Sequence, residues 1–167
     1  MSVTAPSPEI DSCESLFVCE ILEIAPQTLH LQIEEGRSAE ETETVDIGGT
    51  KITGVHRVLP TGRIFEVTWK HYIAYCIRNE LYAEATKDEV IAAGKMFRLY
   101  SKSRFLDYIS RATFATSEYP GPFQHYGVVS ENHIIDVVSV DPPDIREKLR
   151  SISSPTEGHR APRSFSK

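Results

Sequence analysis

The sequence predicts an α+β domain built mostly of strands: a mostly antiparallel, strongly curved sheet or partly open barrel of about seven to eight strands, with one main helix packed on it. Three observations support this class. Short apolar runs, many with polar residues at alternate positions, cover much of the chain. Turns that contain glycine or proline separate them, which favours antiparallel pairing because parallel crossovers need about a dozen residues. Only one segment has a convincing capped helical pattern.

Composition and charge set the limits of this domain. Of the 167 residues, 40% are hydrophobic and 25% charged, which is ordinary for one globular domain. Residues 1–13 and 150–167 are poor in apolar groups, so we expect a disordered N-terminal segment, a single α+β domain at 14–149 and a disordered basic tail. From Asp144 to Lys167 there are six Lys or Arg and three Asp or Glu, whereas the whole chain carries −6. The body is therefore acidic.

The first strands follow from two apolar patterns. Leu16–Ile24 is a nearly continuous apolar run, and Pro26 ends it. Leu29–Ile33 then alternates apolar and polar residues, which predicts a second strand with one wet face. Residues 34–44 are acidic and polar, and we expect them to form an exposed loop.

A hairpin is expected next. Val45–Ile47 and Lys51–Val58 flank Gly48 and Gly49, and two glycines can both take the positive φ that a tight hairpin turn requires. The segment 45–52 also resembles the phosphate-binding hairpin of the ROK family of sugar kinases. That resemblance implies a phosphate site at the glycines, but it covers eight residues, and the rest of the chain carries neither the two-lobed length nor the other motifs of that family. An ordinary hairpin is our interpretation.

The segment Arg63–Glu80 carries the longest alternating pattern. Its odd positions are apolar, aromatic or histidine: Phe65, Val67, Trp69, His71, Ile73, Tyr75 and Ile77. A helix is the alternative, because a stripe with 3.6-residue spacing also exists: Trp69, Tyr72, Ile73, Cys76 and Ile77. The aromatic and β-branched content favours one long strand with a bend near His71.

The second half of the chain holds the helix and a final hairpin. Residues 88–93 suggest a short helix, and Met96–Tyr100 a strand. The main helix is expected at Arg104–Phe114, with Ser101 or Ser103 as its cap. Two further strands, 125–129 and 134–140, form the last hairpin.

An aromatic cavity inside the curved sheet is the first candidate site. His71 interrupts an apolar face, and an imidazole there needs a partner or a function. Trp69, His71 and Tyr75 therefore form the expected wall of a small-molecule site. Residues from other strands complete the ligand-binding set: Arg98, Tyr100 and His125. His71 and His125 are the only candidates for acid–base catalysis, and a structural role is the alternative for both.

Other chemistry has little support in the sequence. His125 and His133 lie on opposite faces if the last hairpin has a two-residue loop, and too far apart for one metal if the loop has three. We therefore expect no metal site and no cofactor. No serine lies in a GxSxG motif, and Cys13, Cys19 and Cys76 have no CxxC spacing.

The function we expect is binding: a small soluble interaction protein such as an inhibitor, immunity-type or adaptor module. Its acidic body would steer a basic protein partner, and the same charge disfavours nucleic acid. The alternative is a small-molecule binder or an enzyme with its site in the aromatic cavity. We expect a cytoplasmic location, because the sequence carries no secretory signal, no membrane-spanning run and an odd number of cysteines. A homodimer through a sheet edge is the expected form of self-association.

Overall fold

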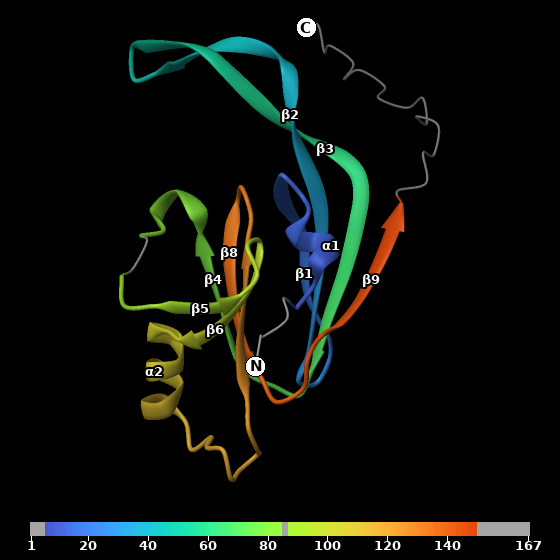
Figure 1. Ribbon diagram of the computed structural model, residues 1–167, viewed down its shortest axis with the longest axis vertical. Helices are drawn as coiled ribbons and strands as arrows, with labels where there is room; N and C mark the ends of the chain where they lie inside the picture. Colours follow the sequence, from blue (N-terminus) through green and yellow to red (C-terminus); the bar gives the residue numbers. More distant parts are fainter. Residues whose placement is uncertain (1–5, 85–86, 150–167) are drawn as a thin grey trace, which may run out of the picture.

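The computed structural model describes residues 6–84 and 87–149, and these fold into two antiparallel sheets with few helices (Figure 1). The four-stranded sheet has the order β1 (Ser15–Ala25), β2 (Thr28–Ile47), β3 (Thr50–Lys70) and β9 (Asp144–Leu149). The five-stranded sheet has the order β4 (Tyr72–Asn79), β8 (His133–Ser139), β7 (Gln124–Val129), β6 (Phe97–Lys102) and β5 (Val90–Ala93). Strand predominance and antiparallel pairing are confirmed. The sheets do not close into a barrel, so the expected single curved sheet or barrel is replaced by two sheets.

The core lies between the two sheets. Apolar side chains at alternate positions of both sheets are buried there, including Leu31, Ile33, Phe65, Val67, Trp69, Phe97, Tyr126, Val128, Ile135 and Val137. The Trp69 ring contacts Phe97 of β6 at 5.9 Å and Tyr126 of β7 at 6.0 Å between centroids. Because one face of each sheet is buried in this way, the opposite faces carry the polar residues of the same strands.

The chain passes from one sheet to the other at His71. The strand expected over 63–80 is divided there: β3 ends at Lys70 and β4 begins at Tyr72. His71 has φ of 54°, a left-handed conformation that breaks the extended backbone. The strand interpretation is thus confirmed over the helical one, and the expected bend is a switch between sheets.

The N-terminal segment differs from the expected disorder. Its described part contains α1 (Pro8–Asp11), a single turn capped by Ser7, and Ile10 is fully buried in the core. The Asp11 carboxylate accepts hydrogen bonds of 2.8–2.9 Å from three successive backbone N–H groups: Lys95, Met96 and Phe97. One apolar residue and one carboxylate dock the turn, a signal too small for composition to reveal. The expected C-terminal tail, 150–167, lies outside the described residues.

Two local predictions are wrong. The acidic stretch 34–44 belongs to β2, because β2 stays paired with β3 along both sides of a long hairpin. The expected short helix at 88–93 gives way to β5, which pairs with β6 at the sheet edge. In both cases pairing with a distant strand overrides local propensity.

The main helix and the last hairpin are where the sequence placed them. α2 (Arg104–Ala112) begins at its N-cap Ser103. A short 3-10 turn, η1 (Glu80–Tyr82), follows β4. In the β7–β8 hairpin Val129 pairs with Ile134, the register of a two-residue loop. His125 therefore lies on the outer face of the five-stranded sheet.

Candidate functional site

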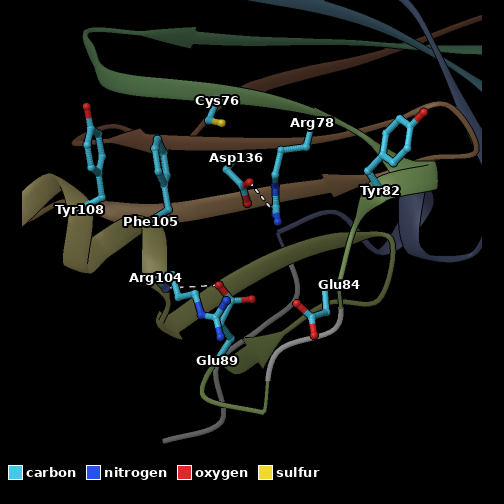
Figure 2. Close-up of a pocket in the computed structure, with 9 residues that line it drawn as sticks. All are labelled: Cys76, Arg78, Tyr82, Glu84, Glu89, Arg104, Phe105, Tyr108 and Asp136. Carbon is cyan, nitrogen blue, oxygen red and sulfur yellow. Dashed lines mark hydrogen bonds and ion pairs between the residues drawn. The ribbon is translucent and has the colours of Figure 1, made fainter.

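A hollow on the outer face of the five-stranded sheet is lined by charged and aromatic side chains (Figure 2). Its volume is about 330 Å³. Arg78 and Asp136 reach into it from β4 and β8, and Phe105 with Tyr108 form the wall on α2. An adjoining hollow of about 340 Å³ shares Arg78 and continues toward β6. These volumes are near the lower end of those found for small-molecule sites.

A buried hydrogen-bond chain lies beneath this hollow. Ser103 Oγ is 2.7 Å from His125 Nδ1, and His125 Nε2 is 3.0 Å from Asp136 Oδ1. The second oxygen of Asp136 accepts a hydrogen bond of 2.8 Å from Arg78 Nη2. His125 and Ser103 are each 1% exposed, whereas the Arg78 side chain is 43% exposed. The chain thus joins a helix N-cap to a cation at the surface.

Strand register brings these residues together. Cys76 of β4 pairs with Asp136 of β8, and Gly127 of β7 pairs with Asp136 from the other side. Side chains at alternate positions share a face, so Arg78, Asp136 and His125 all point away from the core. The N-terminus of α2 then lies over this face and supplies Ser103.

Aromatic rings seal the imidazole. Tyr100 stacks on His125 with centroids 4.5 Å apart and planes 15° apart, and Phe105 meets the same ring edge-on at 5.5 Å. Gly127 leaves the space that the Tyr100 ring occupies, because a Cβ there would lie 2.7 Å from the ring. The absence of a side chain at this position is therefore part of the packing around His125.

Ser103, His125 and Asp136 are the residue types of a serine-hydrolase triad, but their arrangement is different. In that triad the serine bonds to Nε2 and the acid to Nδ1, and the serine faces the substrate. Here the two ring nitrogens are exchanged and Ser103 is buried. Its Oγ already accepts the backbone N–H of Leu106 at 3.0 Å as the helix cap. Both ring nitrogens of His125 therefore have a hydrogen-bond partner, Ser103 Oγ at Nδ1 and Asp136 Oδ1 at Nε2. The trio positions Arg78; it does not present a nucleophile.

The structure divides the six residues predicted from the sequence into three places. Trp69 is buried in the core, and Tyr75 lies on the inner face of β4, where its ring is 5.1 Å from Tyr72. His71 is exposed at the β3–β4 connection and borders a different hollow. The remaining three lie together on the outer face of the five-stranded sheet: Arg98, Tyr100 and His125. Trp69, His71 and Tyr75 thus do not share a cavity with His125.

Three residues of the hydrogen-bond chain were not among the predicted site residues. The sequence predicts Ser103 only as a possible helix cap and gives Arg78 and Asp136 no place in a site. Alternation within β7 and β8 was a usable signal, since the two-residue loop places His125 and Asp136 on one face. The pairing of β4 with β8, which brings Arg78 there, is a long-range contact that local patterns do not reveal.

The second prominent feature is the outer part of the β2–β3 hairpin, residues 37–59, which we call the hairpin arm. Figure 1 shows it extending past the rest of the four-stranded sheet and bending to one side. None of its residues is buried. Its tip carries Ile47, 62% exposed, and Ile52, 44% exposed, around the Gly48–Gly49 turn.

Polar contacts fix the base of the hairpin arm. Glu34 and Glu35 are both buried at the point where the hairpin leaves the body. Glu34 accepts the backbone N–H of Gly62 at 3.0 Å. Glu35 accepts from the Arg37 guanidinium at 3.1 Å and from the Thr61 hydroxyl at 3.1 Å. Two carboxylates therefore brace both strands at the exit point.

An irregular segment follows within the arm. Ser38 pairs with Val58 and Thr42 with His56, so three residues of β2 face the single residue Arg57 of β3. This bulge holds Glu40 and Glu41, both exposed. Bulges of this kind bend a hairpin and redirect its side chains.

Within the described residues there is no cluster of three or more metal-ligating side chains, and no helix is long and apolar enough to cross a membrane. Comparison of the chain with protein-family models, with curated proteins and with solved structures finds no match. The functional proposals below therefore rest on the geometry alone.

Proposed function

We propose that this protein is an interaction module that binds a basic partner protein through the hairpin arm. The observation that carries the proposal is the uncovered apolar tip: Ile47 and Ile52 are 62% and 44% exposed at the end of an arm in which no residue is buried. A long two-stranded hairpin adds little to the stability of the body, so its retention is best explained by contact with another molecule.

The apolar side chains of the tip form one surface. Val45 pairs with Ile52, and Ile47 pairs with Thr50, so these four residues lie on the same face of the hairpin. Burial of an isoleucine side chain contributes about 1.5–3 kcal/mol when it is complete. Two isoleucines in a recess of the partner supply a hydrophobic anchor of the size seen at interface hot spots.

Two exposed carboxylates on the bulge of the arm are the basis for proposing a basic partner. Arg57 forms an ion pair with Glu43 at 2.9 Å, whereas Glu40 and Glu41 have no ion pair among the described residues. Their carboxylates stand on the bulge, between the base and the apolar tip. A basic surface beside an apolar recess complements this order of features, and its attraction weakens with added salt.

The base of the arm lowers the cost of binding because it is already ordered. Besides the two buried glutamates, the Glu14 carboxylate accepts the backbone N–H of Ser38 at 3.2 Å and its hydroxyl. These hydrogen bonds hold the pKa of Glu14 below its ordinary value of 4.5. An element held in its bound direction loses less conformational entropy on association.

We place this interaction in the cytoplasm. The chain has three cysteines, an odd number without CxxC spacing, which suits a reducing compartment. A homodimer through a sheet edge remains the competing arrangement, since both sheets of the described chain have open outer strands.

Site-specific photo-crosslinking tests the proposal. A crosslinking amino acid at Ile47 is expected to capture one stoichiometric protein, and the same residue at Leu22 is the control because Leu22 is an exposed apolar residue of β1 in the body. The captured protein is then purified and titrated with the unmodified chain. The proposal predicts a basic partner whose binding is lost in Ile47→Asp. Equal capture from Leu22, capture of a second copy of this chain, or unchanged binding by Ile47→Asp would refute it.

A further inference from the structure

Arg78 is anchored on one side only. Its Nη2 donates to the buried Asp136, which is itself fixed by His125. The Nε and Nη1 groups of Arg78 have no hydrogen-bond partner among the described residues, and the side chain points into the hollow (Figure 2). A guanidinium held in this way presents its remaining N–H groups as a fixed fork, the geometry that binds a carboxylate with two hydrogen bonds.

Carboxylates line the opposite side of the same hollow. Glu84 borders both adjoining hollows and has no hydrogen bond or ion pair among the described residues. Glu89 lies beside it and accepts the backbone N–H of Arg104 at the start of α2 at 3.2 Å. In Figure 2 the Glu84 and Arg78 side chains approach the hollow from opposite sides. No direct ion pair joins Arg78 and Glu84, so both are available to a ligand; Arg104, a second cation of the lining, lies 3.8 Å from Asp88.

An aromatic surface completes the site. Phe105 and Tyr108 are stacked with centroids 6.1 Å apart and planes 8° apart, and both line the hollow from α2. Tyr108 is more than half exposed. Stacked rings at the edge of a polar hollow provide a place for the apolar portion of a ligand.

We infer that this hollow binds a small zwitterion, a free amino acid with an apolar side chain. Its carboxylate pairs with Arg78, its ammonium group with Glu84, and its side chain lies against Phe105 and Tyr108. This inference does not depend on the hairpin arm, because the arm contributes no residue to the hollow. The buried network then has a use: it holds Arg78 in place before the ligand arrives, at the cost of burying polar groups.

The charge arrangement selects against ligands with only one ionic group. A ligand without the ammonium group leaves Glu84 and Glu89 facing an anion, and one without the carboxylate leaves the remaining N–H groups of Arg78 without an acceptor. Loss of a hydrogen bond to a charged group weakens binding about tenfold to a hundredfold. The hollow is open to solvent, so we expect binding in the range of weak metabolite sites.

Titration followed by two-dimensional ¹H–¹⁵N NMR tests the inference on the full chain. L-phenylalanine is the first probe, followed by the other natural amino acids. N-acetyl-L-phenylalanine lacks the ammonium group, and L-phenylalanine amide lacks the carboxylate. We expect L-phenylalanine to shift the amides of Arg78 and its β8 neighbours, with each derivative at least tenfold weaker. Failure of every amino acid to shift these amides, or binding of either derivative as tight as that of L-phenylalanine, would overturn the inference.

Three variants complete the test. Glu84 is exposed, so Glu84→Gln is expected to fold normally. Its affinity for L-phenylalanine should fall about tenfold or more, which isolates the ammonium contact. Arg78→Gln removes the carboxylate contact and is expected to show a similar loss. Arg146→Gln, on the exposed face of the other sheet, is the matched control and should bind like the parent chain. Unchanged affinity in Glu84→Gln contradicts the inference whether or not Arg78→Gln folds.

Discussion

Replacement of Asp136 is the sharpest test of the buried network. Asp136 is 4% exposed and makes two charge-assisted hydrogen bonds, one to His125 and one to Arg78. In Asp136→Ala the buried Nε2 of His125 loses its only acceptor, which costs about 1–3 kcal/mol. The Arg78 side chain is 43% exposed and regains water, so its share is about 1 kcal/mol. The expected loss of unfolding free energy is therefore about 2–4 kcal/mol.

Urea and thermal unfolding measure this loss. For a domain of this size each kcal/mol lowers the melting temperature by roughly 3 °C, so Asp136→Ala should melt about 6–12 °C lower. Asp136→Asn is the matched control, because its Oδ1 still accepts from His125 while the negative charge that pairs with Arg78 is lost. We expect it to lose only about 1–2 kcal/mol. If Asp136→Ala were as stable as the parent chain, or if Asp136→Asn lost as much stability as Asp136→Ala, then His125 would not depend on Asp136.

The remaining predictions concern packing, pH and thiol reactivity. Gly127→Ala should cost about 1–3 kcal/mol in urea unfolding, because its Cβ would displace the buried Tyr100 ring; a neutral result would contradict the packing. The hydrogen bond from its arginine partner holds the pKa of Glu147 below the ordinary 4.5, so its contribution to stability is present above pH 4.5 and is lost as the pH falls further. Urea midpoints against pH should therefore decline less in acid for Glu147→Gln than for the parent chain. Burial, and then the charge of a nearby glutamate, raises the pKa of the Cys13 thiol, so native alkylation followed by mass spectrometry should modify the exposed Cys19 first; equal rates would refute this.

The sequence predicted the strand content and the local turns well because both depend on neighbours in the chain. The glycine pair at 48–49 does form the tight turn, and the two-residue loop does place His125 and His133 on opposite faces. The capped helix after Ser103 needed only its own cap and apolar stripe. In each case a few adjacent residues determine the conformation.

Features made by distant pairing were not predictable in the same way. The acidic residues 34–44 have little strand propensity, and they are extended because β3 pairs with them. The alternation of 63–80 gave no sign that the residues on either side of His71 join different sheets, so Trp69 and His125 were assigned to one cavity. They lie on opposite faces of the five-stranded sheet instead.

The candidate site illustrates the same limit. His125 was found from its residue type, but its partners Ser103 and Asp136 come from a helix N-cap and from β8. Asp136 in turn accepts from Arg78 of β4, 58 residues earlier in the chain. The pairing order β4–β8–β7 turns these separate polar residues into one network. From the sequence alone, without that strand order, Arg78 is indistinguishable from any other polar residue of an alternating strand.

The most direct test of the interaction proposal is removal of the hairpin arm. Ser38 and Val58 are paired, so Ala39–Arg57 can be replaced by an Asn-Gly turn that keeps the base intact. Calorimetric titration with the partner identified by crosslinking compares the affinities of this variant and the full chain. Thermal unfolding shows whether the body of the variant still folds. The proposal predicts a body that melts within a few degrees of the full chain and shows no measurable binding. A folded variant that still binds the partner with full affinity would contradict it.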